Sequence, residues 1–246
     1  MRAFQLLLMG LIVTIGLQER LGFHSVSAQQ SSVAGKSTDS LPSDVYPDTL
    51  ARAPRMKKSD FTTEEEKQAY DRVLAISPTT AEWNVPGAWL GPTGTRILIP
   101  ELAEIYLQQG LTIRKKGGLE PRFQELTILV ATRECDNKNE FLDHASRENT
   151  RKMISPKIVD IIRNEKDTMG LDEKDALVIR FGRELFHQPK VSSKTFADMQ
   201  RTFGRKGTLA ITLLMGYYST NELVMRVYDQ QLYRRVGERA PAPPWH

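Results

Sequence analysis

His144 is the histidine whose sequence neighbours best suit proton transfer. Glu140 precedes it by four residues, which puts both side chains on one face if the segment is helical. A glutamate placed in this way can accept the proton of one imidazole nitrogen and leave the other nitrogen for acid–base work. The same spacing also occurs in ordinary contacts on helix surfaces. The pair is therefore a candidate catalytic site, with a surface contact as the alternative.

A second carboxylate, Glu125, interrupts the apolar stretch from Phe123 to Ala131. A glutamate in such a stretch is either exposed or buried beside a partner, because an unpaired buried charge is costly. The histidines that follow are weaker candidates. His187 ends a predicted helix, where an imidazole near the negative end of the helix dipole is commonly structural. His246 is the last residue of the chain.

The elements that must position these side chains are predicted to be helices. Thr62 and Glu65 are spaced as a capping box. Pro100 and Pro121 stand where helices can begin, and Gly110 stands where one would end. The predicted helices cover residues 64–75, 101–109, 121–130, 140–152, 156–163, 173–186, 194–203 and 207–233. No stretch alternates long enough to be a strand, so the predicted fold class is all-α, a bundle of about seven or eight helices.

The composition indicates a globular protein with its own core. The chain has 246 residues, of which 40% are hydrophobic and 26% are charged. Its net charge of +4 is too small and too scattered to predict nucleic-acid binding. Its single cysteine, Cys135, excludes an internal disulfide, a Cys-x-x-Cys redox pair and a multi-thiolate metal site.

The N-terminal residues predict export. A basic start and an apolar run from Ala3 to Leu17 precede small residues at Val26-x-Ala28. This pattern is typical of a signal peptide over residues 1–28, with cleavage after Ala28. The run is shorter than the roughly 20 apolar residues that span a bilayer, so no stable membrane insertion is expected after cleavage. The protein is expected in the periplasm or outside the cell.

The rest of the chain divides by composition into three parts. Residues 29–58, rich at first in serine and glutamine, are predicted to be a flexible leader. Residues 59–236 are predicted to be one helical domain, and residues 237–246 a proline-rich tail. Within the domain, residues 77–94 are predicted to be a long loop of the kind that often carries function.

A series of separated motifs runs through the predicted domain. The first are Pro100-Glu-Leu-Ala, Arg122-x-x-Glu125-Leu-x-Ile-Leu-x-Ala131 and Glu140-Phe-x-x-His144. Later come Glu184-Leu185, Val191-Ser-x-x-x-Phe196, Phe203-Gly204 and Leu213-x-x-Gly216-Tyr-Tyr218. In content and order, from about Gly91 to Tyr233, these motifs resemble the carboxymuconolactone decarboxylase family, also called the AhpD-like superfamily. The resemblance implies an AhpD-like helical bundle.

The peroxidase branch of this family resembles Glu-x(11)-Cys-x-x-Cys-x-x-x-His. Counted from Glu125, its two cysteines would fall at Asn137 and Glu140, and its histidine at His144. Both thiols are missing, and Cys135 lies two residues before the first of these positions. Peroxide reduction by thiols needs a thiolate and a resolving partner. An antioxidant, peroxiredoxin-type activity is therefore the disfavoured alternative, and Cys135 is expected to be a small, semi-buried residue.

The thiol-free branch, to which the decarboxylase belongs, resembles Tyr/Phe-Glu-Trp-x-x-His. The segment from Asn139 to His144 matches this pattern, with asparagine for the first aromatic residue and phenylalanine for tryptophan. The family tends to have a glycine after this helix, whereas this chain has Arg151-Lys-Met-Ile-Ser155. The turn there, and with it the rim of the pocket, is expected to differ.

The resemblance implies a cofactor-free lyase with decarboxylase-type acid–base chemistry on a small organic acid or lactone. His144 would deliver or shuttle the proton, with Glu125 or Glu140 setting its charge state. No metal and no organic cofactor are expected. Because such catabolism is normally cytoplasmic, export implies a different substrate. A non-catalytic protein that binds a small molecule in the same pocket is a further alternative.

Substrate-binding residues are expected around the same pocket. Arg96 is the nearest candidate for a substrate carboxylate, because a guanidinium pairs with a carboxylate through two hydrogen bonds. Trp89 and Tyr218 could form its walls. A surface charge is the alternative for Arg96, and a core aromatic residue is the alternative for Tyr218. The family resemblance also implies a homo-oligomer, a trimer or hexamer, which fits the apolar stripes of the last predicted helix.

Overall fold

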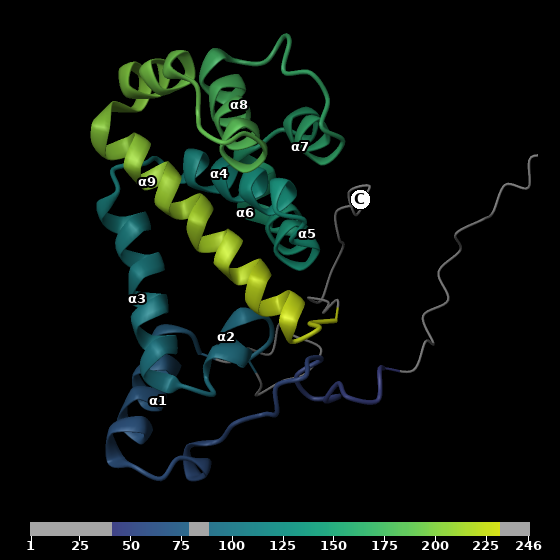
Figure 1. Ribbon diagram of the computed structural model, residues 1–246, viewed down its shortest axis with the longest axis vertical. Coiled ribbons are helices and arrows are strands. Elements are labelled where there is room, and N and C mark those ends of the chain that lie inside the picture. The colour runs from purple at the N-terminus through teal and green to yellow at the C-terminus, as the bar shows by residue number, and fades with distance from the viewer. Residues whose placement is uncertain (1–40, 79–88, 232–246) are drawn as a thin grey trace, which may run out of the picture. The chain divides into compact units, whose positions relative to one another are not determined.

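The chain folds into α-helices, which confirms the predicted all-α class. The computed structural model describes residues 41–78 and 89–231, and the predicted signal peptide and proline-rich tail lie outside these residues. The described part contains nine α-helices, one 3-10 helix at Lys58–Asp60 and no strand beyond an isolated bridge between Tyr46 and Ala51. The helices are α1 (Glu64–Ile76), α2 (Pro92–Arg96), α3 (Pro100–Lys116), α4 (Pro121–Glu134), α5 (Lys138–Ser146), α6 (Glu148–Met153), α7 (Pro156–Arg163), α8 (Glu173–His187) and α9 (Ser193–Val227) (Figure 1).

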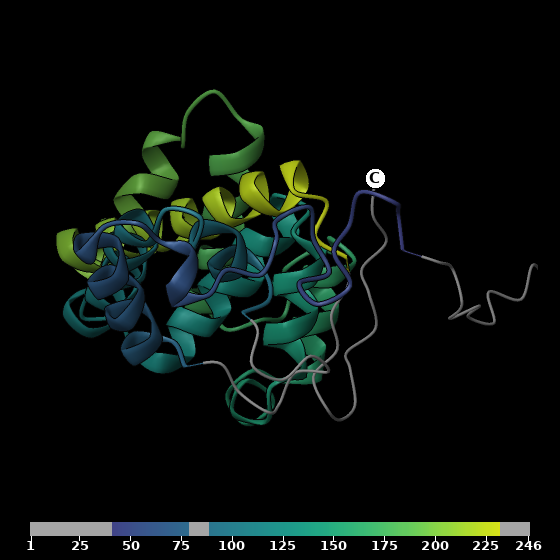
Figure 2. The ribbon, with the colours of Figure 1, turned by 90° about the horizontal axis from the view of Figure 1, so that it is seen from below.

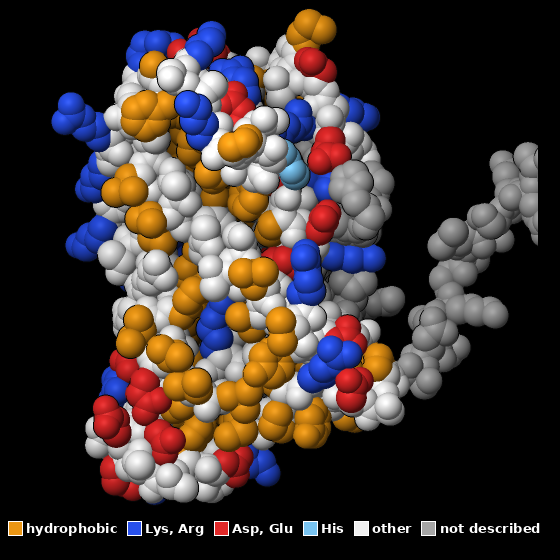
Figure 3. Space-filling model, viewed as in Figure 1, with side chains coloured by type: hydrophobic (Ala, Val, Ile, Leu, Met, Phe, Trp, Pro, Cys, Tyr) orange, Lys and Arg blue, Asp and Glu red, His pale blue; other side chains and the backbone are white. Residues whose placement is uncertain are grey.

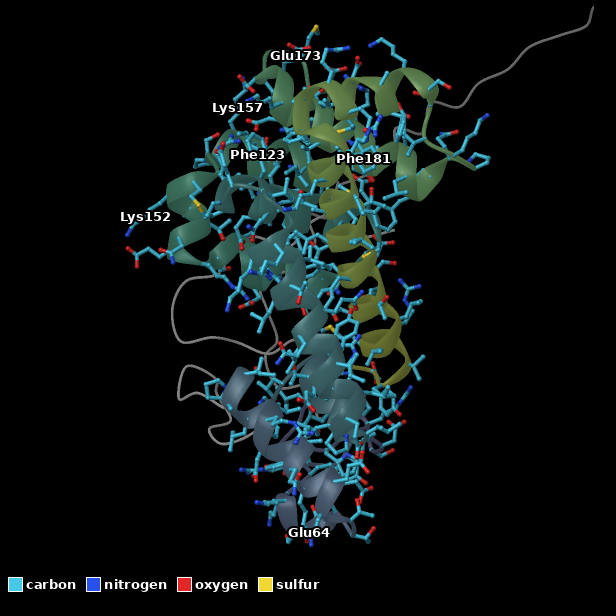
Figure 4. All side chains as sticks on the ribbon, turned by 90° about the vertical axis from the view of Figure 1, so that its left-hand side faces the viewer. Glu64, Phe123, Lys152, Lys157, Glu173 and Phe181 are labelled. Carbon is cyan, nitrogen blue, oxygen red and sulfur yellow. The ribbon has the colours of Figure 1, made fainter. Side chains whose placement is uncertain are left out.

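Helix α4 lies at the centre of the main core. Pro121 begins it at the first helical position, and every residue from Leu126 to Ala131 is fully buried. Helices α5, α7, α8 and α9 pack against it. Figure 4 places Phe123 and Phe181 among the packed helices and Lys152 at their outer edge. Since α4 is covered along its length, a carboxylate on it needs a partner inside the protein.

A smaller core joins α1, α2 and α3. It consists of Val73, Trp89, Ile97 and Ala103. The capping box of α1 uses Thr63 and Glu66, one residue later than the predicted pair, because Thr62 and Thr63 are adjacent and each precedes a glutamate by three residues. The loop predicted over residues 77–94 ends too late, because α2 begins at Pro92, and residues 79–88 of this loop lie outside the described part.

The two helices predicted over residues 194–203 and 207–233 both form, and the span labelled α9 contains them one after the other. They meet at a kink at Gly204, whose φ of 67° favours a residue without a Cβ atom. The helix ends at Val227 and not at Tyr233, because Asp229 adopts a positive φ of 46° and turns the chain. Figure 2 shows α9, in yellow-green, lying across the teal helices. No helix of the described part combines the length and apolar character needed to cross a membrane.

Two other predicted boundaries are wrong. Helix α3 continues through Gly110, where a Cβ atom would lie 2.8 Å from Cζ of Tyr217. This glycine allows the close approach of α9 and is not a stop signal. The helix predicted over residues 140–152 is broken into α5 and α6, because Arg147 has an extended backbone with φ −64° and ψ 134°.

The second half of the predicted leader is packed against the domain. Within residues 41–58, Val45 and Ala51 are buried. The backbone N–H of Arg52 donates a hydrogen bond of 2.7 Å to the carbonyl of Tyr228, just after α9. The flexible leader predicted over residues 29–58 therefore does not extend through these residues, because their backbone is hydrogen-bonded to the chain after α9 and Leu50 packs against Met225.

Candidate active site

His144 is held between a glutamate and a tyrosine from two other helices. Its side chain, on α5, is only 2% exposed. Nδ1 lies 2.9 Å from Oε2 of Glu125 on α4, and Nε2 lies 2.9 Å from the hydroxyl oxygen of Tyr218 on α9. The structure therefore joins three of the predicted site residues through hydrogen bonds to the two ring nitrogens.

The turn between α4 and α5 sets the position of the histidine. Asp136 adopts a positive φ of 59° there. Asn137 then caps α5, because its side-chain oxygen accepts a hydrogen bond of 3.0 Å from the backbone N–H of Glu140. Asn137 stands where the peroxidase branch would have its first cysteine, and in this chain it starts a helix. His144 then lies four residues after Glu140, on the side of α5 that meets Glu125.

The ionised Glu125 assigns the protons of the imidazole, because a carboxylate can only accept a hydrogen bond from Nδ1–H. Nη2 of Arg114 donates to the Tyr218 oxygen at 2.7 Å, so the hydroxyl hydrogen is free to donate to Nε2 of His144. The hydrogen of neutral His144 is then on Nδ1, from which it donates to Glu125. The hydroxyl of Thr150 donates to the same oxygen of Glu125 at 2.8 Å. A neutral histidine beside an ionised glutamate satisfies every member of this network.

Burial and charge favour the same protonation states. Burial, followed by the positive charge of Arg147, lowers the pKa of His144. Burial opposes ionisation of Glu125, but the hydrogen bonds from His144 and Thr150 outweigh it, so the pKa of Glu125 is lowered. Burial raises the pKa of Tyr218. At neutral pH the three groups are therefore carboxylate, imidazole and phenol.

Glu140 is close to His144 but is not its hydrogen-bond partner. Its Oε2 lies 3.7 Å from Nε2, which is too long for a hydrogen bond. Asn221 donates to its other oxygen at 3.4 Å. Burial, with a smaller contribution from Asp143, raises the pKa of Glu140 to about 7. Glu140 is therefore a carboxylic acid that can lose its proton near neutral pH.

His144 and Glu140 line a cavity of about 370 Å³, a size that suits a small molecule. All three residues predicted to bind substrate, Arg96, Trp89 and Tyr218, also line it. The other lining residues include Leu90, Leu107, Leu111, Arg114, Arg147 and Tyr217. The cavity therefore combines apolar walls with positive charge and a proton-transfer network.

Arg96 lies in the cavity wall with neutral partners. Its guanidinium donates to the side-chain oxygen of Asn221 at 2.9 Å and to the carbonyl of Thr220 at 3.4 Å. Its Cζ lies 3.6 Å from the ring centroid of Tyr106, a cation–π contact. Burial lowers the pKa of Arg96, so a bound anion would stabilise its charged form.

The sequence does not single out the other polar residues of the site. Arg114 lies in a run of three basic residues, which is typical of the last turn of any helix. Thr150 and Asn221 carry no motif. Arg147 lies between α5 and α6, inside the stretch that the sequence predicts to be one helix. Each of these residues reaches the site only because helices that are distant in sequence pack together.

Two groups of described residues bring possible metal ligands together. One group consists of Glu140, Asp143 and His144, and the other of Glu134, Glu165 and His187. Within each group the ligand atoms lie within 4.8 Å of one another. In the first group Arg147 pairs with Asp143, and in the second Arg133 pairs with Glu165 at 3.1 Å. A guanidinium already neutralises a carboxylate in each group, so neither donor set fits a cation well.

Cys135 does not line the cavity in the described structure. Its sulfur lies 4.0 Å from the carbonyl oxygen of Thr132, at the end of α4. Burial, with the nearby charge of Glu222, raises the pKa of the thiol to about 12, which disfavours the thiolate.

No protein-family model matches this chain, and a search of the curated proteins finds no match.

Proposed function

We propose that the protein is an exported, cofactor-free lyase of the carboxymuconolactone decarboxylase-like kind, acting on a small organic acid or lactone. One observation carries the proposal. The hydrogen bonds from Glu125 through His144 to Tyr218 end at the wall of a cavity that also contains Arg96. Such a site can hold an anion and move a proton to or from it.

In the proposed reaction Arg96 holds a carboxylate of the substrate. The bond between the substrate carbon and a carboxylate breaks, and carbon dioxide leaves. The electron pair passes into a neighbouring unsaturated carbonyl group. The surrounding guanidinium groups stabilise the resulting dienolate, and a proton returned to carbon completes the product.

His144, once it has taken up a second proton, is the proposed source of the proton returned to carbon. Its protonated form is stabilised by the ionised Glu125 at 2.9 Å, which also fixes the orientation of the ring. Glu140, with a pKa of about 7, is a second acidic group on the same cavity. Its protonated form keeps negative charge away from the entering carboxylate.

The proposal is tested by supplying the protein with a panel of small carboxylic acids and lactones. The panel includes acids in which a double bond or carbonyl group lies two carbons away from the carboxylate. The carbon dioxide released from each compound is measured. We expect His144→Ala and Arg96→Ala to lose turnover. His187→Ala is the matched control, because His187 also pairs with a glutamate, Glu134 at 2.8 Å, but outside this cavity. Turnover that survives in His144→Ala would contradict the proposal.

A non-catalytic binding protein is the second candidate. Both ring nitrogens of His144 are already occupied by protein groups, which suits a site that only holds a ligand. The two candidates differ in one measurement. A binding protein would take up an acid of the panel without changing it, and would keep that affinity in His144→Gln.

Export and assembly complete the proposal. The signal peptide proposed over residues 1–28 would deliver the protein to the periplasm or beyond the cell, where the substrate is met. We propose that a second copy of the chain covers an exposed stripe on α9, as part of a trimer or hexamer. This α9 stripe consists of Leu209, Leu213, Gly216, Thr220, Leu223 and Val227.

The spacing of the α9 stripe supports packing against another helix. Its members are four and three residues apart in alternation, the pattern of helices that pack side by side. Leu209, Leu223 and Val227 are 58%, 60% and 67% exposed. Leu102 and Ile105 of the neighbouring α3 are also exposed. Figure 3 shows hydrophobic side chains along this face of the molecule.

A further inference from the structure

Both ring nitrogens of His144 are already hydrogen-bonded to protein groups, so neither can contact a substrate directly. Nδ1 is held by Glu125 and Nε2 by the Tyr218 hydroxyl, each at 2.9 Å, and the side chain is 2% exposed. A proton that leaves Nε2 meets the oxygen of Tyr218 first. Both residues line the cavity, and because Nε2 is occupied by the Tyr218 hydroxyl, that hydroxyl is the group through which Nε2 can exchange a proton with a molecule bound there.

The oxygen of Tyr218 can make three hydrogen bonds, one as a donor and two as an acceptor. Nη2 of Arg114 occupies one acceptor position at 2.7 Å. When His144 is neutral, the hydroxyl donates to Nε2. When His144 is protonated, Nε2–H donates to the second acceptor position. The hydroxyl hydrogen is then released from the histidine and is available to the cavity.

We propose that Tyr218 is the catalytic acid that passes the proton to the substrate, with His144 as the group that replaces it. This inference rests on the proposed lyase function. In the transfer, the Tyr218 O–H bond breaks as a C–H bond forms on the substrate carbon. The Nε2–H bond of His144 breaks as a new O–H bond forms on Tyr218. The tyrosine ends neutral and the histidine ends neutral, and His144 then takes a proton from water.

The two transfers are expected to occur together and not through a tyrosinate. Burial raises the pKa of Tyr218, which makes a separate tyrosinate costly. Arg114 donates to the same oxygen and stabilises the negative charge that develops there during transfer. Glu125, on the other side of the imidazole ring, stabilises the positive charge of the imidazolium. Arg114 is thus a positioning and polarising residue, which acts through Tyr218.

Turnover should fall as the pH rises, because each decarboxylation consumes one proton from protonated His144. Several charged or titratable groups face this pair and will shape the profile. They are Glu125 from α4, Glu140 and Asp143 from α5, Arg147 between α5 and α6, Arg114 from α3, and Arg96 from α2.

The first experiment compares Tyr218→Phe, His144→Gln and Tyr46→Phe in the carbon dioxide assay. Tyr218→Phe keeps the ring and removes only the hydroxyl, and we expect turnover to fall by about a hundred-fold or more. Tyr46→Phe is the matched control, because this hydroxyl lies on an exposed residue outside the cavity. Thermal unfolding shows whether each variant is folded. Wild-type turnover in Tyr218→Phe with none in His144→Gln would overturn the role of Tyr218 and keep the lyase.

A second measurement needs no substrate. In a ¹⁵N–¹H spectrum of the histidine rings of the wild-type protein, the signals of His144 are identified by their loss in His144→Gln. We expect Nδ1 to be protonated and Nε2 to show an accepted hydrogen bond, which Tyr218→Phe removes. An Nε2 signal that is unchanged in Tyr218→Phe would overturn the inference. A shift in this signal combined with no turnover of any acid in wild type would contradict the lyase proposal instead.

Discussion

Nδ1 of His144 lies 2.9 Å from Oε2 of Glu125, although 19 residues separate the two in sequence. The pair crosses from α5 to α4, and its second partner, Tyr218, comes from α9. Three helices that pack in one core thus supply a fixed tautomer of a buried imidazole. The stability of that core and the protonation of its carboxylates are open to direct measurement.

Asp175→Asn should destabilise the fold strongly. The Asp175 side chain is 3% exposed and accepts hydrogen bonds of 2.6 and 2.7 Å from the two terminal nitrogens of Arg122. Without the carboxylate, the part-buried guanidinium loses its counter-charge, at a cost of about 3 kcal/mol. Urea unfolding measures the change. Asp44→Asn is the control, because it breaks an exposed pair with Arg52 and should cost less than about 1 kcal/mol. Equal losses in the two variants would contradict the prediction.

Glu140→Gln should stabilise the protein at high pH and not at low pH. The pKa of Glu140 is raised from 4.5 to about 7, so between these values the folded protein keeps a proton that the unfolded chain has lost. The wild-type protein therefore loses stability as the pH rises through this window, whereas glutamine stays neutral. At pH 8 we expect the variant to be more stable by roughly 1 to 3 kcal/mol.

Urea unfolding at pH 4 and pH 8 checks this prediction. The exposed Glu65→Gln on α1 serves as the control and should change the stability by less than about 0.5 kcal/mol. A stability difference between Glu140→Gln and wild type that is the same at both pH values would show that folding does not raise the pKa of Glu140.

The fold was predictable because helix signals are local. Pro121 and Asp172 begin α4 and α8, and the apolar periodicity between such signals gives the all-α class. The predicted ends were less accurate where packing decides them. Gly110 appears in the sequence as a stop, but α3 continues because the glycine makes room for Tyr217. A local pattern cannot show which helix approaches a glycine.

The candidate site was predictable in part for the same reason. Glu140 and His144 share one helix, so their proximity follows from spacing, although Glu125 and not Glu140 holds the imidazole. The hydroxyl of Tyr218 reaches His144 across 74 residues, and a tyrosine in an apolar helix reads equally well as part of the core. Arg114 is hidden for the same reason.

Cys135 should be an unreactive thiol. With a pKa of about 12, only about one thiol in ten thousand is ionised at pH 8. We expect a thiol reagent to label the native protein at least about a thousand-fold more slowly than the urea-unfolded chain. We also expect wild type and Cys135→Ala to consume peroxide equally slowly. Fast labelling of the native thiol, or a loss of peroxide consumption in Cys135→Ala, would favour the peroxidase alternative.

Charges placed in the α9 stripe should separate the proposed oligomer into monomers. Leu213 and Leu223 are 42% and 60% exposed on α9, so glutamate at both positions costs the isolated chain little. Between two copies, the same carboxylates would be buried without partners. Light scattering after gel filtration should show a trimer or hexamer for wild type and a monomer for the double variant Leu213→Glu, Leu223→Glu.

Met169→Glu is the matched control, because Met169 is 84% exposed on the segment between α7 and α8, away from the stripe. It exchanges an exposed apolar side chain for a charge and should leave the mass unchanged. A monomeric wild-type protein would contradict the assembly, as would a double variant that keeps the wild-type mass. If Met169→Glu dissociates as well, another surface holds the copies together. The cavity lies on the other side of α9 from the stripe, since Tyr218 is buried and the stripe is exposed, so the monomeric variant should keep its fold and its ligand site.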